Sequence, residues 1–347
     1  MEIKEAIKKV TGLIDLTMEE SRSVFDGIMS GSATPAQIGA LLAGLRMKGE
    51  TVDEITGAAE AMRSKAVRIK IAGVSGDGDG VLMDTCGTGG TGKNTFNIST
   101  TVAFILAAAG IKVAKHGNRA ASGKCGSADV LEELGVKIDI PADSTRKCIE
   151  QINIGFLFAP LFHKAMKYAV APRREMGIRT IFNLLGPLSN PADANCQVIG
   201  VYDADLTEKM AGVLGKLGIR RACVVHGENM FDEVTLSGKT RVSEVANGEL
   251  STFYLCPEDF GFRTRKDIVI EGGGREENAG IVRAVLSGRE KGPALETVLM
   301  NASLAFYTAG EVSDYKEGVA KGLSVIRSGA AEKTLGDLIN LTNKDAI

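Results

Sequence analysis

Residues 81–100, VLMDTCGTGGTGKNTFNIST, join a glycine-rich loop to a run of hydroxyl and amide side chains. From Gly87 the loop fits both G-x-G-x-x-G, which is typical of dinucleotide sites, and the G-x-x-x-x-G-K of nucleotide hydrolases. We expect a strand at residues 81–83, a loop at 84–95 and a helix from Ser99. Glycines let the backbone approach an anion, and the helix N-terminus offers unpaired N–H groups. The segment therefore predicts a phosphate site, with a purely structural turn as the alternative.

Two details separate the nucleotide patterns. A dinucleotide site requires an acidic residue about 20 positions on, at the end of the next strand, to bind a ribose. That strand ends in Lys115 and His116, so we reject the dinucleotide interpretation. A nucleotide hydrolase has Ser or Thr directly after the Lys to reach magnesium. Asn94 stands there instead, which weakens the hydrolase interpretation and leaves it open.

A second loop, KHGNRAASGKCGSAD at residues 115–129, mixes cations, glycines and hydroxyls. Lys115, His116, Arg119 and Lys124 supply positive charge, the glycines permit close approach, and the serines give directional donors. Both loops follow strands that we expect to be neighbours in one sheet. Together they suit one ligand that carries two separated phosphate groups.

The stretch VVHGENMFDEV places two adjacent carboxylates, Asp232 and Glu233, in a loop after a strand that ends at Val225. Such a pair can bind a hard cation through oxygen, and magnesium shared with a diphosphate fits the two anion loops. The pair alone is weak evidence, because acidic pairs are common on solvated loops. We assign no role to His163 or His226.

The composition limits the classes of partner. The 347 residues carry 41 basic and 43 acidic side chains, so the net charge of −2 offers no attraction for nucleic acid or an anionic membrane. No segment approaches the roughly 20 apolar residues that cross a bilayer, and the N-terminal MEIKEAIKKV lacks the apolar stretch of a signal peptide. Six scattered cysteines without metal-site spacing indicate reduced thiols in a cytoplasmic protein.

Two kinds of element must position these residues. Residues 1–72 are expected to form a helical domain of short amphipathic helices, and three residue pairs have the capping-box form, namely Thr17 with Glu20, Thr34 with Gln37, and Thr51 with Glu54. So small a bundle is marginal alone and must pack against a larger body or a second subunit.

Residues 73–347 alternate short apolar runs with helical stretches, which predicts an α/β domain with a mostly parallel central sheet flanked by helices. The expected strands lie at residues 81–83, 111–114, 156–159, 198–201 and 222–225. Residues from about 161 to 187 also have a helical pattern. We expect them to leave the sheet and join the helical domain.

The motifs GTGG, NTFNIST, KHGNR, SGKCGSADVLEELG, GIRTIFNLLGPLSNP and DEV have the order and spacing found in the anthranilate phosphoribosyltransferase family. The chain resembles this family over nearly its whole length. The resemblance implies transfer of 5-phosphoribose from 5-phosphoribosyl 1-diphosphate to the amine of anthranilate, giving N-(5-phosphoribosyl)anthranilate and diphosphate in tryptophan biosynthesis. It also implies two magnesium ions and a homodimer formed through the helical domain.

The same resemblance implies a role for individual residues. The contacts implied for phosphoribosyl diphosphate are Gly87, Gly90, Thr91, Thr95, Asn97, Ile98, Ser99, Thr100, Lys115, Ser122, Gly123 and Ser127. Those implied for anthranilate are Gly87, His116, Asn118, Arg173, Gly186 and Pro187. The implied magnesium ligands are Ser99, Asp232 and Glu233, and no residue is implied as an acid or base. The guanidinium fork of Arg173 suits the carboxylate of anthranilate.

Two residues depart from the family pattern. Thr91 stands where the family usually has Asp, which removes a negative charge beside the diphosphate. Lys164 follows His163 where the family often has Pro, at the edge of the acceptor site.

Three other functions are weighed against this one. A pyrimidine nucleoside phosphorylase has the same architecture, but KHGNR and the Asp232–Glu233 pair speak against it. A nucleic-acid-binding relative without the chemistry is disfavoured by the balanced charge. A nucleotide hydrolase is the third.

Overall fold

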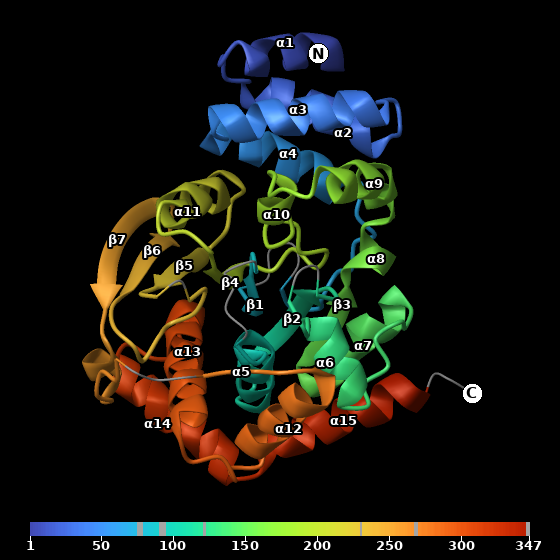
Figure 1. Ribbon diagram of the computed structural model, residues 1–347. Coiled ribbons are helices and arrows are strands. Elements are labelled where there is room, and N and C mark those ends of the chain that lie inside the picture. The colour runs from blue at the N-terminus through green and yellow to red at the C-terminus, as the bar shows by residue number, and fades with distance from the viewer. Residues whose placement is uncertain (75–78, 90–94, 121–122, 230, 267–269, 345–347) are drawn as a thin grey trace.

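The computed structural model describes residues 1–74, 79–89, 95–120, 123–229, 231–266 and 270–344. A helical bundle sits on one side of a seven-stranded sheet, and a layer of longer helices covers the other side (Figure 1). The strands run in the order β3-β2-β1-β4-β5-β6-β7. Their bounds are β1 Leu82–Gly87, β2 Lys112–Gly117, β3 Ile154–Phe158, β4 Cys196–Gly200, β5 Arg221–Gly227, β6 Thr240–Ala246 and β7 Glu249–Leu255.

The bundle consists of α1 Ile3–Thr11, α2 Met18–Met29, α3 Pro35–Lys48 and α4 Val52–Ser64, with α9 Lys167–Met176 packed against α2 and α3. The three predicted capping boxes are confirmed, at the N-termini of α2, α3 and α4. Each Thr side chain accepts a hydrogen bond from the backbone N–H of the Glu or Gln three residues further on, whose side chain accepts in return from the Thr N–H. Local sequence therefore determines where these helices begin.

The remaining helices lie between strands or after β7. They are α5 Ile98–Ala108, α6 Ser127–Glu133, α7 Ala142–Ile152, α8 Ala159–Phe162, η1 Lys164–Met166, α10 Phe182–Leu185, α11 Leu206–Lys216, η2 Pro257–Phe260, α12 Arg275–Leu286, α13 Pro293–Ala309, α14 Tyr315–Arg327 and α15 Ala330–Lys344. Among the described residues, no helix is long and apolar enough to span a membrane.

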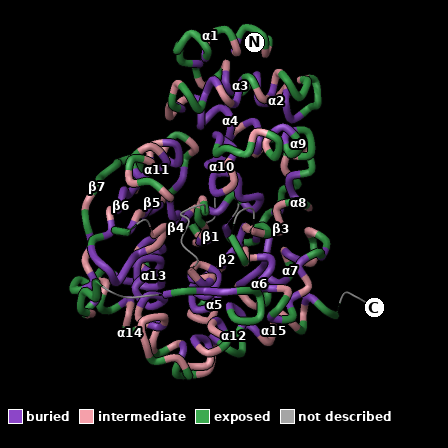
Figure 2. The backbone as a smooth tube through the Cα atoms, in the orientation of Figure 1, coloured by how far each residue is buried: buried purple, intermediate pink, exposed green. Residues whose placement is uncertain are grey.

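The sheet is buried on both faces because successive side chains of a strand alternate in direction. In β5, Cys223 and Val225 belong to the core with the long helices, while Ala222 and Val224 belong to the core on the bundle side. α13 runs along the first of these faces and is buried over most of its length (Figure 2). The bundle core is continuous with the sheet, since Leu42 and Ile55 share it with Ile199 and Leu214.

The predicted fold class is confirmed: β1 to β5 pair in parallel, with helices on both sides of the sheet and a small helical bundle beside it. Several bounds differ from the expectation: β2 continues to Gly117 and so includes Lys115 and His116, β3 spans Ile154–Phe158, and β5 continues to Gly227. The predicted boundary between strand and loop at residue 84 is wrong, because β1 continues to Gly87 and includes Asp84. The antiparallel pair β6 and β7, which extends the sheet beyond β5, was not predicted.

Candidate active site

The loop that carries the two carboxylates crosses the ends of β1 and β4. Gly87 and Gly200 are register partners there. A Cβ atom on Gly200 would lie 1.6 Å from the Asp232 carbonyl oxygen, and one on Gly87 would lie 2.9 Å from Asp232 Oδ2. At Gly200 only glycine leaves room, because a Cβ would meet backbone, whereas at Gly87 the Asp232 side chain would have to shift.

One pocket brings together Ser99, Asp232 and Glu233, the three residues expected to bind magnesium. Thr85 and Asn301 also line it. Asn301 of α13 holds the loop through two bonds to Val234, with its Oδ1 accepting from the backbone N–H and its Nδ2 donating to the carbonyl, both at 3.0 Å. Asn301 was missed from sequence because 67 positions separate it from Val234.

The electrostatics of the carboxylate pair favour a cation. Burial raises the pKa of Asp232, and burial together with the neighbouring Asp232 carboxylate raises the pKa of Glu233 well above its usual value. Glu233 Oε2 is enclosed and has no hydrogen-bond partner within the described part of the chain. The described residues contain no group of three or more His, Cys, Asp and Glu side chains placed for a metal. Magnesium commonly uses one or two carboxylates and takes its other oxygens from water and phosphate, so the residues fit it.

Lys115 and Asp84 are buried next to this pocket. Lys115 Nζ donates to the carbonyl oxygen of Thr85 and lies 3.2 Å from Ser99 Oγ. Asp84 accepts from Asn190 Nδ2 at 2.8 Å and from the His116 N–H at 3.2 Å. Burial lowers the pKa of Lys115 and raises that of Asp84. The network ties β1 and β2 to the turn at residues 186–190, and Asp84 had no predicted role because its partners are distant along the chain.

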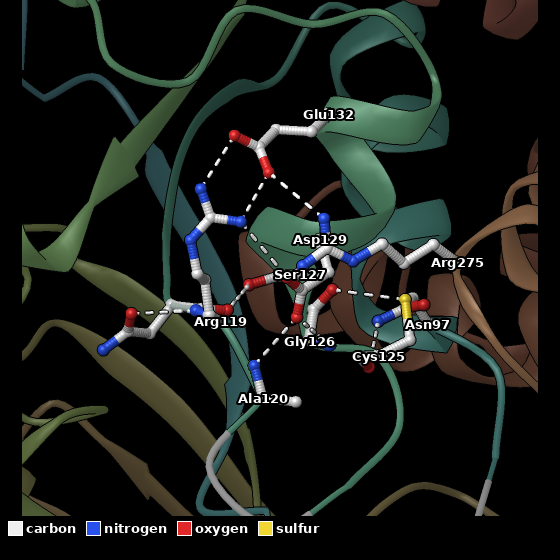
Figure 3. Close-up of polar contacts among 10 residues, drawn as sticks. Asn97, Arg119, Ala120, Cys125, Gly126, Ser127, Asp129, Glu132 and Arg275 are labelled. Carbon is white, nitrogen blue, oxygen red and sulfur yellow. Dashed lines mark hydrogen bonds and ion pairs between the residues drawn. The ribbon is translucent and has the colours of Figure 1, made fainter.

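The second loop is fastened to α6 by ion pairs (Figure 3). Arg119 bonds both Asp129 and Glu132, and Arg275 of α12 reaches Asp129 at 2.7 Å. Asp129 also accepts from the backbone N–H groups of Ala120 and Gly126, each at 2.9 Å. From sequence, Arg119 is expected among the cations available to an anion. Its charge is instead matched by the two carboxylates, so it shapes the loop.

Two of the residues expected to contact anthranilate, His116 and Gly186, meet near the end of β2. His116 Nδ1 donates to the Gly186 carbonyl at 3.1 Å, which leaves Nε2 as a buried acceptor without a partner within the described residues. Its ring centroid lies 5.1 Å from that of His163. Burial, with a smaller contribution from His163, lowers the pKa of His116 to about 3, and burial lowers the pKa of His163 to about 4. His116 is therefore neutral near pH 7.

Arg173 projects from α9 with its guanidinium carbon 5.1 Å from the centre of the Phe182 ring. Burial lowers its pKa. Asn118 is exposed and its Oδ1 accepts from the Arg119 N–H, while the Pro187 carbonyl accepts from Gln197 Nε2 at 3.0 Å. Arg173 is thus held against α10, and Asn118 is held within the second loop.

Several expected site residues sit at the start of α5 and in the second loop. Ile98, Ser99 and Thr100 form the first turn of α5, with Thr95 and Asn97 just before it. Gly123 is exposed, and Ser127 opens α6 with its hydroxyl donating to the Asn118 carbonyl at 3.3 Å. Gly90, Thr91 and Ser122 lie outside the described residues. Lys164 is exposed at the start of η1.

Comparison with known proteins places this geometry in one family. Residues 79–332 match the glycosyl transferase family a/b domain, and residues 4–66 match the helical bundle domain of the same family. The chain is similar to the anthranilate phosphoribosyltransferase of Desulfosudis oleivorans, 52% identical over 341 residues that cover 98% of this chain and 99% of the relative. That of Geobacter sulfurreducens is 52% identical over 350 residues, covering 99% of this chain and 100% of the relative.

Solved structures agree. Anthranilate phosphoribosyltransferase from Thermus thermophilus superposes with a TM-score of 0.91 at 41% identity, over 97% of this chain and 99% of that one. The enzyme from Saccharomyces cerevisiae in complex with PRPP and Mg has a TM-score of 0.88 at 27% identity, over 99% and 98% of the two chains.

Proposed function

Because this chain belongs to the anthranilate phosphoribosyltransferases of the glycosyl transferase family, we propose that its two loops bind the phosphoribosyl donor and that the Asp232–Glu233 loop binds magnesium against it. The chain is a pentosyltransferase. It transfers 5-phosphoribose from 5-phosphoribosyl 1-diphosphate to the amine of anthranilate in tryptophan biosynthesis.

The proposed donor contacts are those at the glycine loop, the start of α5 and the second loop. The first N–H groups of α5 point out of the helix at Ser99 and Thr100, beside the buried ammonium of Lys115. Unpaired N–H groups and a nearby cation are what a phosphate group requires. Thr91, Gly90 and Ser122 remain part of this proposal from the sequence alone.

Ser99, Asp232 and Glu233 would hold magnesium, and we propose two ions. The single observation that carries this assignment is their convergence on one pocket, with an unpartnered Glu233 oxygen within the described residues. Magnesium, when bound, supplies positive charge to the departing diphosphate. In the structure of the yeast enzyme it accompanies PRPP, which supports the assignment.

On the acceptor side we propose that Arg173 binds the anthranilate carboxylate, with Asn118, His116, Gly186 and Pro187 around the ring. An aromatic amine is uncharged near pH 7, so its lone pair is available without a strong base. His116 suits this role because it remains neutral and presents an acceptor rather than a charge. Orientation of the amine beneath the sugar carbon then supplies much of the rate.

We propose that the reaction passes through no covalent enzyme intermediate. Breaking the bond from the sugar carbon to diphosphate builds positive charge on the sugar and negative charge on the leaving group. Lys115 and the α5 N–H groups are fixed in place before the reaction, so they stabilise the leaving group without reorganisation.

We also propose a homodimer formed through residues 1–72, with residues 73–347 as the donor-binding domain. Large apolar side chains remain exposed on the bundle, with Met47 83% and Leu13 68% exposed. Met47 lies near the end of α3 and Leu13 just beyond α1, and these helices touch where a Cβ on Gly44 would meet Val10 at 2.6 Å. A cytoplasmic location is proposed from the cysteines, all six of which are free thiols.

Loss of anthranilate fluorescence on addition of phosphoribosyl diphosphate and magnesium tests the assignments. Changing Asp232 and Glu233 together to Ala should reduce turnover by at least about 100-fold, because the leaving group loses its metal. Arg173→Ala should mainly raise the KM for anthranilate. Near-normal turnover of the double variant would refute the metal site. An Arg173→Ala effect on the donor KM alone would reverse the two subsites.

A further inference from the structure

The first turns of α12 carry Arg275 and Asn278. Asn278 contacts Asn97 at the start of α5, and Arg275 contacts Asp129 beside the second loop. Asn278 is 1% exposed, although a carboxamide loses hydration on burial and must recover it in hydrogen bonds. Neither Arg275 nor Asn278 was singled out in the sequence. Their contacts reach the two loops from the same short helical segment.

The Asn278 carboxamide bridges two segments. Its Oδ1 accepts from the Gly273 N–H at 2.7 Å, and its Nδ2 donates to Asn97 Oδ1 at 3.0 Å. Asn97 Nδ2 in turn donates to the carbonyl of Cys125 at 3.3 Å. A continuous chain of hydrogen bonds therefore runs from α12 through the start of α5 to the second loop.

These bonds determine what the Asn97 side chain does. Asn97 is the N-cap of α5, a position where an Asn side chain normally accepts from the helix's own first N–H groups. Here the Asn97 side chain makes no such bond. Its Oδ1 accepts from Asn278 and its Nδ2 donates to the Cys125 carbonyl. The N–H of Ile98 donates to the Phe96 carbonyl, and the N–H groups of Ser99 and Thr100 are left for a ligand.

The packing keeps α12 close to this turn. A Cβ on Gly272 would lie 2.7 Å from the Phe96 backbone nitrogen and 2.6 Å from Asn278 Oδ1, so the backbone passes with no room for a side chain. One turn earlier on α12, Arg275 holds Asp129, which orders the second loop through Ala120 and Gly126 (Figure 3). α12 thus contacts both loops.

We propose that Asn278 is a positioning residue for the transferase reaction, which sets the spacing of the two anion loops through Asn97 and so tunes binding of the doubly phosphorylated donor. This inference rests on the proposed function, specifically on Asn97 and the second loop binding that donor. Asn278 acts on the donor side only, since its bonds reach no residue assigned to anthranilate.

Steady-state kinetics on the full-length enzyme with magnesium test it. Asn278→Ala is expected to raise the KM for phosphoribosyl diphosphate about 10-fold, while the KM for anthranilate stays within about twofold. Asn278→Asp keeps the oxygen that faces Gly273 and loses the donor to Asn97, so it should show the same shift. This nearly isosteric variant also serves if the Ala variant does not fold. A wild-type donor KM in Asn278→Asp overturns the proposal.

Ser21→Ala is the matched control. Ser21 is fully buried in the bundle and donates to the Glu54 carbonyl at 2.6 Å, so its loss also removes a buried hydrogen bond. It should lower the Tm without changing either KM. If Ser21→Ala changes the donor KM as much as Asn278→Ala does, the effect is one of stability and the proposal fails.

A double-mutant cycle with Asn97→Ala separates the inference from the function on which it rests. If Asn278 acts through Asn97, its effect on the donor KM should largely disappear in the Asn97→Ala background. If changing Asn278 raises the donor KM by the same factor in the Asn97→Ala variant as in the unaltered chain, the proposed role of Asn278 is overturned. A donor KM unchanged by Asn97→Ala alone overturns instead the proposed donor site.

Discussion

At the residue scale, the absence of a side chain at Gly200 allows Asp232 to reach the position proposed for it in the magnesium site. The Gly200 Cα faces the Asp232 backbone so closely that a Cβ would lie 1.6 Å from the carbonyl oxygen. The sequence shows only a glycine at the end of an apolar run. Its function becomes visible when the loop from residues 231–234 is placed over the sheet.

Gly200→Ala should displace Asp232 and reduce magnesium-dependent turnover by at least about 10-fold, with a loss of about 1–3 kcal/mol in the free energy of unfolding. Kinetics against magnesium concentration and urea unfolding measure both. Gly212→Ala is the control, because a Cβ there meets Val52 at an ordinary 3.6 Å inside α11. The Gly212→Ala variant should gain up to about 1 kcal/mol in the free energy of unfolding, because alanine favours a helix more than glycine does. Unaltered magnesium dependence in Gly200→Ala would contradict the role of the close approach.

The two buried histidines make stability depend on pH. An unfolded histidine takes up its proton near pH 6.5, whereas the folded pKa values lie at about 3 for His116 and about 4 for His163. The unfolded state therefore binds more protons between these values. The free energy of unfolding should fall as pH drops from about 6.5 towards 4, by up to about 1.4 kcal/mol per pH unit for each histidine.

Urea unfolding of the substrate-free protein at several pH values measures this slope. His163→Gln should flatten the slope relative to the unaltered chain, because one of the two imidazoles that must stay neutral is gone. Parallel slopes in the two proteins would show that His163 does not contribute.

At the scale of elements, the capping boxes show what local sequence decides and where burial adds to it. The box of α3 is exposed, with Gln37 Oε1 accepting from the Thr34 N–H at 2.9 Å. The box of α4 has the same form, but its Glu54 is fully buried. Glu54 accepts from the backbone N–H groups of Thr51 and Leu16, and from Lys48 Nζ, each at 2.9 Å.

Glu54→Ala should therefore cost about 2–4 kcal/mol of unfolding free energy, because two backbone donors lose their acceptor and Lys48 loses one of its two carboxylate partners, keeping Asp15. Gln37→Ala, the matched change in the exposed box, should cost only about 0.5–1 kcal/mol. Thermal and urea unfolding compare the two. Equal losses would mean that the contacts of Glu54 beyond its own helix add nothing.

At the scale of the whole molecule, the helical bundle and the sheet share a single core. Leu42 of α3 and Leu214 of α11 belong to one buried cluster, which explains why so short a bundle can fold. Met47 and Leu13 remain outside that cluster and exposed, and the proposed dimer would cover them.

Met47→Glu should shift the protein towards monomers in sedimentation velocity, because a charge placed in an apolar interface is costly. Leu250→Glu, on the exposed face of the edge strand β7, should leave the assembly unchanged. A mass unaffected by Met47→Glu would refute the proposed dimer surface.

The sequence by itself determined the periodic and local features: the alternation of strands and helices, the capping boxes, and the glycine and cation loops at strand ends. These follow from spacing along the chain, since a helix start depends on residues three positions apart. The motifs shared with the family also predicted the transferase activity. The length of β1 was underestimated, because Asp84 is tolerated in the sheet through partners distant in sequence, among them Asn190, the His116 N–H and the nearby Lys115 charge.

Only the tertiary structure decided how far-separated residues act together. Asp232 over Gly200, Asn301 on Val234, Arg119 on Asp129 and Glu132, and Asn278 on Asn97 are contacts between elements. Their partners are chosen by which strands and helices become neighbours, and no local pattern encodes that choice. The residue types could therefore be identified from the sequence, whereas the proposed division between ligand-binding and supporting residues depends on which elements pack together.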